Sequence, residues 1–249
     1  LWKYCMFRRE KSLVLTDLPD KIRQVNTCEI TNRKEYMDAE RDLIMYLQKY
    51  KDADDDKIAK AMRGEVMVRI NILRQISARG KVRDVIEFVK DFRENGKKII
   101  LFCSLHEVVD QLKRYFPTAV SVTGRDSQDE KQRAVDAFQN NPKADIIICS
   151  IKAAGVGLTL TASSNVAFVE FPWTYADCCQ CEDRAHRIGQ KDSVTCYYFL
   201  GRRTIDEKVY RIIQEKKNIA NAVTGSTEDI EENIVDMVAR IFDTDYDDE

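Results

Sequence analysis

Short unbroken hydrophobic runs recur along the chain from about residue 97. They are, in order, Ile99–Cys103, Ala119–Val122, Ile146–Cys149, Val166–Val169 and Val194–Leu200. Runs that do not alternate with polar residues are typical of strands covered on both faces. Amphipathic stretches separate the runs, and three of them open with a capping-box pattern: Ser104-x-x-Glu107, Ser127-x-x-Glu130 and Thr204-x-x-Glu207. This alternation predicts an α/β fold, an open parallel sheet with helices on both faces.

The first third of the chain has a more helical pattern. Lys34–Tyr50 and Lys57–Ala78 predict two helices around an acidic break, and Gln24–Ile30 predicts one strand. The region from Asp206 to Arg240 is again mostly helical, with an interruption at Gly225. We therefore expect three parts. They are a helical appendage and linker over residues 1–80, the α/β lobe over 81–225, and a helix with an acidic tail over 226–249.

Composition sets limits on the function. Of the 249 residues, 44% are hydrophobic and 33% are charged, as in an ordinary globular protein. The net charge of −2 and a pI near 5.9 argue against a broadly cationic surface. Any contact with nucleic acid must then come from local placement of Lys and Arg. No hydrophobic run approaches the roughly 18 residues of a membrane helix, so no membrane partner is expected. The opening Leu1-Trp2 predicts a fragment of a longer protein.

The cysteines raise the question of disulfides or a metal site. There are eight, without two Cys-x-x-Cys pairs and with only two histidines to help them. Cys103 and Cys149 lie within the hydrophobic runs, where a free thiol packs as a small apolar side chain. We expect reduced cysteines, no metal site and an intracellular protein, nuclear in a eukaryote or cytoplasmic in a bacterium.

Polar residues stand where several predicted strands end. They are Ser104, Thr123 with Gly124, Ser150 and Glu170. Ligands of open parallel sheets gather at this edge. Within the segment that follows Ser150, Gly155 and Gly157 allow a ligand to approach the backbone, and Lys152 and Thr159 could help to hold a phosphate. A tight turn explains two glycines equally well.

The segment Gln180–Gln190 carries the most specific chemistry. Gln180, Arg184 and Arg187 are spaced i, i+4 and i+7, which predicts that one stripe of a helix presents all three. The neighbouring stripe is small or apolar and can face a core: Cys178, Cys181, Ala185 and Ile188. Two planar guanidinium groups suit a phosphate chain. The alternative is a solvated face with surface ion pairs.

The pattern Gln-x-x-Asp-Arg-x-x-Arg, completed by Ile-Gly-Gln, resembles motif VI of superfamily-two helicases in its Swi/Snf form. The loop after Ser150 resembles motif V, with its Leu-Thr-Leu continuation. Ile99–Leu112 resembles motif IV, although the family often has Gln where Leu105 stands. Phe7–Lys11 and Leu18–Lys21 resemble the junction that leaves the first lobe of such enzymes. The likeness covers nearly the whole chain, and its layout suggests the annealing-helicase or fork-remodelling branch.

The resemblance implies a RecA-like second ATPase lobe of a Swi/Snf-type DNA translocase. In that reading Arg184 and Arg187 are the catalytic arginines. Gln180 and Asp183 orient the nucleotide or couple it to DNA, and Gly155 and Gly157 form the coupling loop. The DNA-backbone contacts are implied at Ser104, Thr123, Gly124, Arg125, Lys152 and Thr159.

The sequence has no phosphate-binding G-x-x-x-x-G-K-[ST] segment. ATP with Mg²⁺ is therefore expected to be held mainly by a first ATPase lobe of the same polypeptide, with double-stranded DNA as the other partner, and this fragment alone is expected to be inactive. Two alternatives stay open. One is a non-catalytic nucleic-acid or protein-binding module with the helicase fold, and the other is an RNA helicase of the same superfamily.

Overall fold

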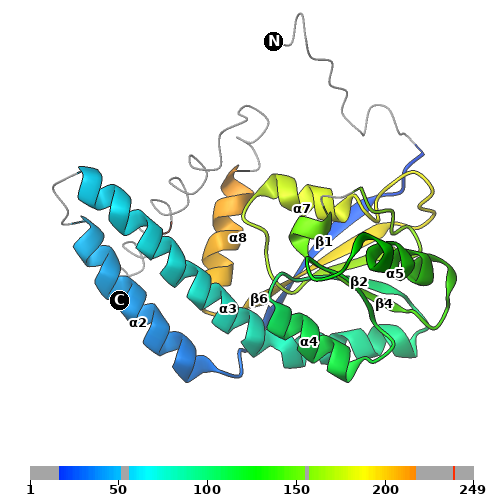
Figure 1. The fold of residues 1–249 in the computed structure, drawn as a ribbon, viewed down its shortest axis with the longest axis horizontal. Coiled ribbons are helices and arrows are strands. Elements are labelled where there is room, and N and C mark those ends of the chain that lie inside the picture. The colour runs from blue at the N-terminus through cyan, green and yellow to red at the C-terminus, as the bar shows by residue number, and fades with distance from the viewer. Residues whose placement is uncertain (1–16, 52–55, 155–156, 217–237, 239–249) are drawn as a thin grey trace, which may run out of the picture.

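A six-stranded sheet forms the centre of the molecule (Figure 1). The computed structural model describes residues 17–51, 56–154, 157–216 and 238. The strands are β1 (Lys21–Cys28), β2 (Ile99–Phe102), β3 (Val120–Val122), β4 (Ile146–Cys149), β5 (Asn165–Phe168) and β6 (Val194–Gly201). They lie in the order β1-β6-β5-β2-β4-β3, and every neighbouring pair is parallel. The predicted open parallel sheet is confirmed.

Helices cover both faces of the sheet, as expected. They are α2 (Arg33–Lys51), α3 (Asp56–Glu94), α4 (His106–Tyr115), α5 (Gln128–Asn140), α6 (Ile151–Ala154), α7 (Tyr175–Glu182) and α8 (Ile205–Lys216). Ile100 and Phe102 of β2 face a core shared with α5, α7 and α8. Ile99 and Leu101 face a second core, shared with α4 and the last half of α3. Because β2 is buried on both faces, its hydrophobic run is unbroken.

The two predicted amino-terminal helices exist as α2 and α3, which pack against each other and project from one side of the sheet (Figure 1). The α3 helix is longer than expected. It continues past residue 80 to Glu94, and its last half packs on the sheet through Val82, Val85 and Val89. The predicted strand, observed as β1, pairs with β6 along its whole length. The described residues before position 81 thus contribute β1 to the sheet, and the boundary expected at residue 80 falls inside α3.

The middle of α3 approaches the rest of the chain closely at Gly80. A Cβ atom placed there would lie 2.2 Å from Asn32 Oδ1 and 2.7 Å from Ile30 Cβ. The Gly80 carbonyl also accepts a hydrogen bond from the backbone N–H of Thr31, at 3.1 Å. A glycine inside a long helix is therefore explained by the close contact with the connection between β1 and α2.

A buried ion pair joins α3 to the start of α8. Lys81 Nζ lies 2.5 Å from Asp206 Oδ2 and donates to the carbonyl of Phe199 at 2.8 Å. Ser77 Oγ donates to the same carboxylate oxygen at 2.7 Å. The side chains of Lys81 and Asp206 are only 1% and 6% exposed. Burial of these charges is tolerated because each has several partners.

The three predicted helix caps have different outcomes. Ser127 and Glu130 form the expected capping box at α5. Ser104 is not a cap, which corrects the prediction: Leu105 precedes α4 and caps it with no side-chain bond. The carboxylate of Glu170 instead accepts the backbone N–H groups of Ser104 and Leu105, at 3.0 and 2.7 Å. A charged acceptor at a helix start is favoured over a hydroxyl.

The third cap, Thr204, has only half of the expected arrangement. Its hydroxyl accepts the backbone N–H of Asp206 at 3.2 Å. The Glu207 carboxylate, however, accepts from the backbone N–H of Arg203 at 3.1 Å, one residue before the expected position. Arg203 has a φ of 52°, so the tight turn before α8 shifts the partner of Glu207 by one residue.

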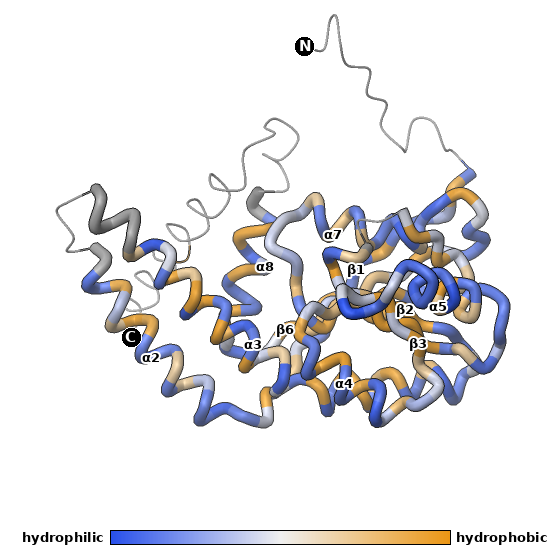
Figure 2. Tube along the Cα trace, in the orientation of Figure 1, coloured by the Kyte–Doolittle hydropathy of each residue, from blue (hydrophilic) through white to orange (hydrophobic). Residues whose placement is uncertain are grey.

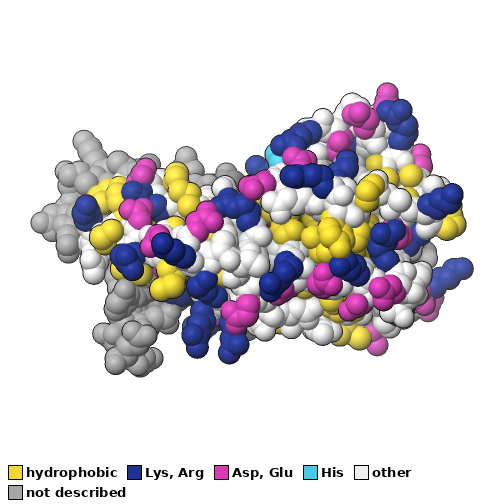
Figure 3. Space-filling view, turned by 90° about the horizontal axis from the view of Figure 1, so that it is seen from below, with side chains coloured by type: hydrophobic (Ala, Val, Ile, Leu, Met, Phe, Trp, Pro, Cys, Tyr) yellow, Lys and Arg dark blue, Asp and Glu magenta, His cyan; other side chains and the backbone are white. Residues whose placement is uncertain are grey.

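Charged, apolar and cysteine side chains are distributed differently over the described part of the molecule. Lys and Arg side chains are interspersed with Asp and Glu in the view from below (Figure 3). Apolar residues gather in the sheet and along the helices α2 and α3 (Figure 2). Cys178 and Cys181 are buried, and none of the described residues forms a group that could hold a metal ion. Among the described helices, none is long and apolar enough to cross a membrane.

Candidate functional site

The segment with the two arginines begins on α7 and continues beyond it. Gln180 lies on the helix and is exposed, whereas α7 ends at Glu182. Arg184 and Arg187 therefore stand on the turns that follow, and the prediction of a single helical stripe was wrong. The backbone N–H groups of Ala185 and His186 both bond to the carbonyl of Glu182, at 3.1 and 2.9 Å. This pattern closes the helix one turn before Arg187.

The buried side chain of Gln190 fixes the end of this turn. Its amide nitrogen donates to the carbonyl of Ser163 at 2.9 Å and to that of Ala185 at 3.3 Å. Its amide oxygen accepts from the backbone N–H groups of Lys191 and Asp192. Gly189 has a φ of 100°, a conformation that a side chain would strain. We refer to residues 183–190 as the arginine turn.

Two guanidinium groups stand together on the arginine turn. Arg184 is half-buried, and its Nε atom is buried with no hydrogen-bond partner among the described residues. Burial lowers the pKa of Arg184 below its usual range, and the nearby charge of Arg187 lowers it further. Arg187 itself is exposed. A buried donor without an acceptor, beside a second cation, is an arrangement that an anionic group would stabilise.

The arginine turn contacts the glycine-containing loop, as far as that loop is described. The carbonyl of Arg184 accepts the backbone N–H of Leu160 at 2.9 Å, and Arg187 donates to the carbonyl of Gly157 at 3.4 Å. Gly157 has a φ of 61°, and Thr159 is exposed. Gly155 lies outside the described residues. The two motifs therefore meet at Gly157, which is exposed and binds Arg187 through its carbonyl.

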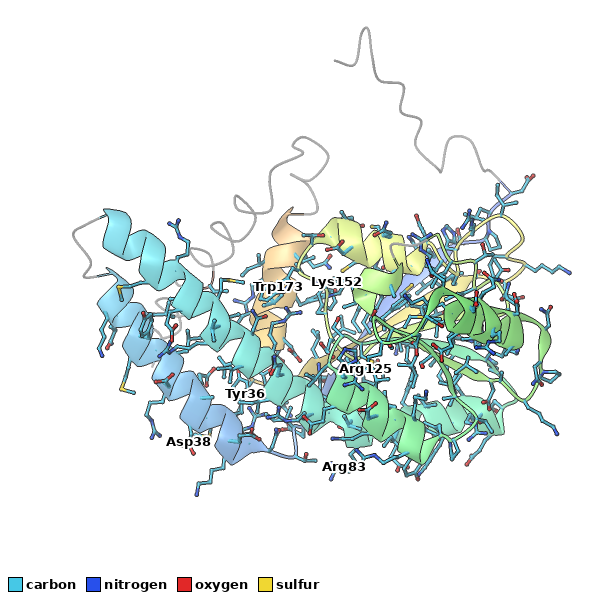
Figure 4. The ribbon with its side chains drawn as sticks, viewed as in Figure 1. Tyr36, Asp38, Arg83, Arg125, Lys152 and Trp173 are labelled. Atoms are coloured by element: carbon cyan, nitrogen blue, oxygen red, sulfur yellow. The ribbon has the colours of Figure 1, made fainter. Side chains whose placement is uncertain are left out.

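A cavity of about 460 Å³ opens beside α7 at the carboxyl edge of the sheet. Three of the predicted site residues line it: Ser104, Lys152 and Gln180. Trp173 forms part of its wall and lies near Lys152 (Figure 4). Arg74 of α3 stacks over the Trp173 ring, 3.8 Å from its centre, and donates to the carbonyl of Phe171. Sequence patterns did not indicate Arg74 or Trp173.

The loop after β3 holds the other predicted nucleic-acid residues, and most of its polar groups bind one another. Thr123 is buried, and its hydroxyl donates to Asp126 at 2.8 Å. The backbone N–H of Thr123 also donates to that carboxylate, at 2.6 Å. Arg125 is exposed and forms an ion pair with Asp110 at 3.1 Å, and Gly124 is exposed. Arg125 lies apart from Lys152 and Trp173 (Figure 4).

A buried carboxylate beside the arginine turn was missed by the sequence reasoning. Glu182 is fully buried and binds Arg23 through both oxygens, at 2.8 and 2.7 Å. Lys21 Nζ lies 2.8 Å from Glu182, and the hydroxyl of Tyr198 donates to it. Burial raises the pKa of Glu182, but Arg23 and Lys21 outweigh burial and hold it below its usual range. The sequence contained a signal for this cluster: Lys21 and Arg23 are two positions apart, so a strand presents both cations on the same face.

The groups present fit part of a nucleotide. Arg184 and Arg187 suit a phosphate group, because their charges lie close together and the Nε atom of Arg184 is buried with no acceptor among the described residues. No described residues form a cluster of acidic or histidine ligands for Mg²⁺. The arginine turn can therefore neutralise the charge of a phosphate group.

Comparison with known proteins finds a matching family model and several relatives of this chain. Residues 80–189 match the family model "Helicase conserved C-terminal domain". The chain is 30% identical over 218 residues to a Xenopus tropicalis protein named "SWI/SNF-related matrix-associated actin-dependent regulator of chromatin subfamily A-like protein 1". It is 31% identical over 232 residues to the human "DNA annealing helicase and endonuclease ZRANB3". These matches cover 85% and 89% of this chain, but only 22% and 20% of those proteins.

Solved structures share the fold. The C-terminal part of the Fun30 ATPase domain superposes with a TM-score of 0.66 at 17% identity, over 88% of this chain and 98% of that one. The Sulfolobus solfataricus SWI2/SNF2 ATPase core with double-stranded DNA has a TM-score of 0.65 at 22% identity, over 86% and 48%. The architecture is that of a RecA-like helicase C-terminal lobe. Together with the relatives above, these findings support a helicase C-terminal lobe of the Swi/Snf type.

Proposed function

We propose that this chain is the second ATPase lobe of a DNA-dependent translocase, and that Arg184 and Arg187 act on ATP held mainly by a first lobe. The observation that carries the proposal is the arginine turn, where the Nε atom of Arg184 is buried without an acceptor beside a second guanidinium. When the lobes close, these groups would face the γ-phosphate and stabilise the charge of the transition state. Mg²⁺ would be held by the first lobe.

Gln180 and Asp183 orient this half of the site in the proposal. Gln180 lies on the last turn of α7 at the cavity, and Asp183 directly precedes Arg184 and is bonded to Lys21 at 3.2 Å. Gly157 binds Arg187 through its carbonyl, which would link the nucleotide to the coupling loop that includes Gly155. Movement of this loop would then accompany closure of the lobes.

Double-stranded DNA is the proposed second partner. Ser104 and Lys152 line the cavity and are exposed, and Thr159 is exposed on the coupling loop. Gly124 and Arg125 offer a second exposed contact on the loop after β3. Thr123 would act by shaping that loop, because its hydroxyl already binds Asp126. Contacts from so few groups would be weak and sensitive to salt.

Names of relatives support the proposal, because they include a DNA annealing helicase and, in Mycoplasma pneumoniae, an uncharacterized ATP-dependent helicase. An enzyme of this kind would work inside the cell, in the nucleus of a eukaryote or the cytoplasm of a bacterium. The absence of disulfides among the described cysteines agrees with that location.

The test compares this chain alone with the same chain joined to its first lobe. We expect no phosphate release above background from the chain alone, with or without DNA, because it lacks the groups that cradle the phosphates. The joined protein should hydrolyse ATP, and duplex DNA should stimulate it more than duplex RNA of the same length. DNA-stimulated turnover by the chain alone, abolished by Arg187→Ala, would overturn the two-lobe proposal. Greater stimulation by RNA would favour the RNA-helicase alternative.

A further inference from the structure

The first strand of the sheet meets the arginine turn through a cluster of charges. Arg23 of β1 binds both oxygens of Glu182, the last residue of α7. Lys21 of the same strand binds Glu182 at 2.8 Å and Asp183 at 3.2 Å. The side chain of Glu182 is 0% exposed, and those of Lys21 and Arg23 are 17% and 25% exposed. The carboxylate is thus enclosed, and its cations come from β1.

Two further bonds tie the segment around β1 to the same region. The ring nitrogen Nε2 of His186 lies 2.7 Å from the carbonyl oxygen of Pro19. The backbone N–H of Val194 donates to the carbonyl of Asp20 at 2.8 Å, which starts the pairing of β1 with β6. Residues 19–23 therefore contact the turn at its beginning and at its middle.

Glu182 is connected directly to the arginines. Its carbonyl accepts the backbone N–H groups of Ala185 and His186, so the position of Glu182 sets the path of the turn. Arg184 is two residues beyond Glu182 and is tied on its other side to Leu160. The series of contacts therefore runs from β1 through Glu182 to the arginine turn, and from there to the coupling loop.

We propose that Arg23 is a positioning residue, whose two-pronged bond to Glu182 holds the arginine turn in the geometry that the two guanidinium groups need. This inference rests on the proposed function. In a two-lobe enzyme the chain would enter this lobe through the segment before β1. A shift of that segment would then move Arg23 and, through Glu182, the arginine turn that carries Arg184 and Arg187. Arg23 would touch neither ATP nor DNA.

The test uses Arg23→Met in the two-lobe protein, with Lys81→Met as the matched control. Both substitutions remove the cation of a buried ion pair, but Lys81 contacts Asp206 and does not contact the arginine turn. We expect Arg23→Met to lower kcat about tenfold or more, with the KM for ATP changed less than threefold. Lys81→Met should lower the melting temperature at least as much, with kcat within twofold of the parent.

Two additional measurements keep the test informative if Arg23→Met does not fold or if the proposed function is wrong. Arg23→Lys keeps the charge but loses the planar fork, so its kcat should lie between those of the parent and Arg23→Met. It remains informative if Arg23→Met does not fold. Hydrogen exchange of the backbone amides of residues 183–190, measured in this chain without ATP, should be faster in the Arg23 variants than in Lys81→Met. That readout does not depend on the proposed function.

The outcomes separate the two ideas. If Arg23→Met and Lys81→Met change kcat equally, Arg23 has a structural role only, and the inference is overturned. Unchanged exchange at residues 183–190 in the Arg23 variants also overturns it. If exchange rises but Arg184→Lys and Arg187→Lys keep normal turnover, the positioning contact stands, whereas the proposed role of the arginines fails.

Discussion

The arginine turn lies at the amino ends of β1 and β6, and the loop after β3 lies at the carboxyl edge of the sheet, and both carry arginine. They differ in how their polar groups are used. In the loop after β3, Asp126 accepts from the N–H and hydroxyl of Thr123, and Arg125 is paired with Asp110. In the arginine turn, the buried Nε of Arg184 has no acceptor among the described residues. A loop whose polar groups bind one another can shape a surface, whereas a turn with a buried donor that lacks an acceptor can bind an anion.

The largest effect is expected at the arginine turn. Replacing Arg184 or Arg187 by Lys in the two-lobe protein keeps the charge but loses the planar fork. Turnover should fall by about 10³, the lower end of the effect of arginine fingers. The KM for ATP and the affinity for DNA should stay within a few-fold, because ground-state binding rests on the first lobe. Steady-state ATPase assays over a range of ATP concentrations measure this.

Arg93→Lys is the matched control for this substitution. Arg93 lies near the amino ends of the strands, where it forms an ion pair with Asp145 at 2.6 Å. Its replacement should leave turnover within about twofold, as expected for a surface ion pair. Near-normal turnover in the Arg184 and Arg187 variants, or a loss seen only as weaker DNA binding, would show that the turn resembles the loop after β3 in function.

The second prediction concerns the carboxylate of Glu182, which supports the arginine turn. Glu182→Gln should lower the free energy of unfolding by about 2 kcal/mol at pH 7. This is less than for a fully buried pair, because Lys21 and Arg23 keep some contact with water. The folded-state pKa of Glu182 lies below its usual range. The ionised group therefore stabilises the fold above the unfolded pKa of about 4.3, and this stabilisation is lost as the pH falls through the folded pKa.

The difference between the parent and Glu182→Gln should accordingly shrink below about pH 4, measured by urea unfolding from pH 7 downward. Glu107→Gln provides the control, because Glu107 is exposed and lies 3.8 Å from Arg79. It should change stability by less than about 0.5 kcal/mol at pH 7. A constant difference between parent and Glu182→Gln at every pH would show that the carboxylate contributes through packing and not through its charge.

The fold followed from the sequence better than the site did. Runs such as Ile146–Cys149 are buried on both faces, so their pattern alone identifies them as strands. The arginine turn was misread because Gln180, Arg184 and Arg187 have helical spacing, which describes local preference only. Their path is set by distant groups, including the side chain of Gln190 bound to Ser163. No local spacing encodes a contact between residues 27 positions apart.

The same limit explains β1 and the cap of α4. The strand was expected as part of an appendage because two predicted helices follow it in the first third of the chain. Among the described strands, however, β1 is at the edge of the sheet and pairs with β6 alone, and an edge strand needs less burial. Ser104 was expected to cap α4, and the carboxylate of Glu170, far along the chain, takes that place. Short patterns predicted the α5 cap correctly because both partners, Ser127 and Glu130, lie within one turn.

The smallest effect is expected for single DNA contacts. Lys152 is exposed at the cavity, and no ion-pair partner is found for it among the described residues, whereas Arg125 is already paired with Asp110. Lys152→Ala should weaken duplex DNA binding by the two-lobe protein a few-fold and reduce the slope of log K against log salt by about 1. Arg125→Ala should have the weaker effect, because Asp110 offsets its charge before DNA arrives.

Fluorescence anisotropy with labelled duplex DNA at several salt concentrations measures both variants. Lys97→Ala is the control, because Lys97 is exposed before β2, at the opposite edge of the sheet. Its slope should match that of the parent, since a lysine outside the proposed interface releases no counterions on binding. If Lys97→Ala reduced the slope as much as Lys152→Ala, binding would depend on total charge and not on the carboxyl edge. If Arg125→Ala had the larger effect, the loop after β3 would be the main DNA contact of this lobe, even though its other polar groups bind one another.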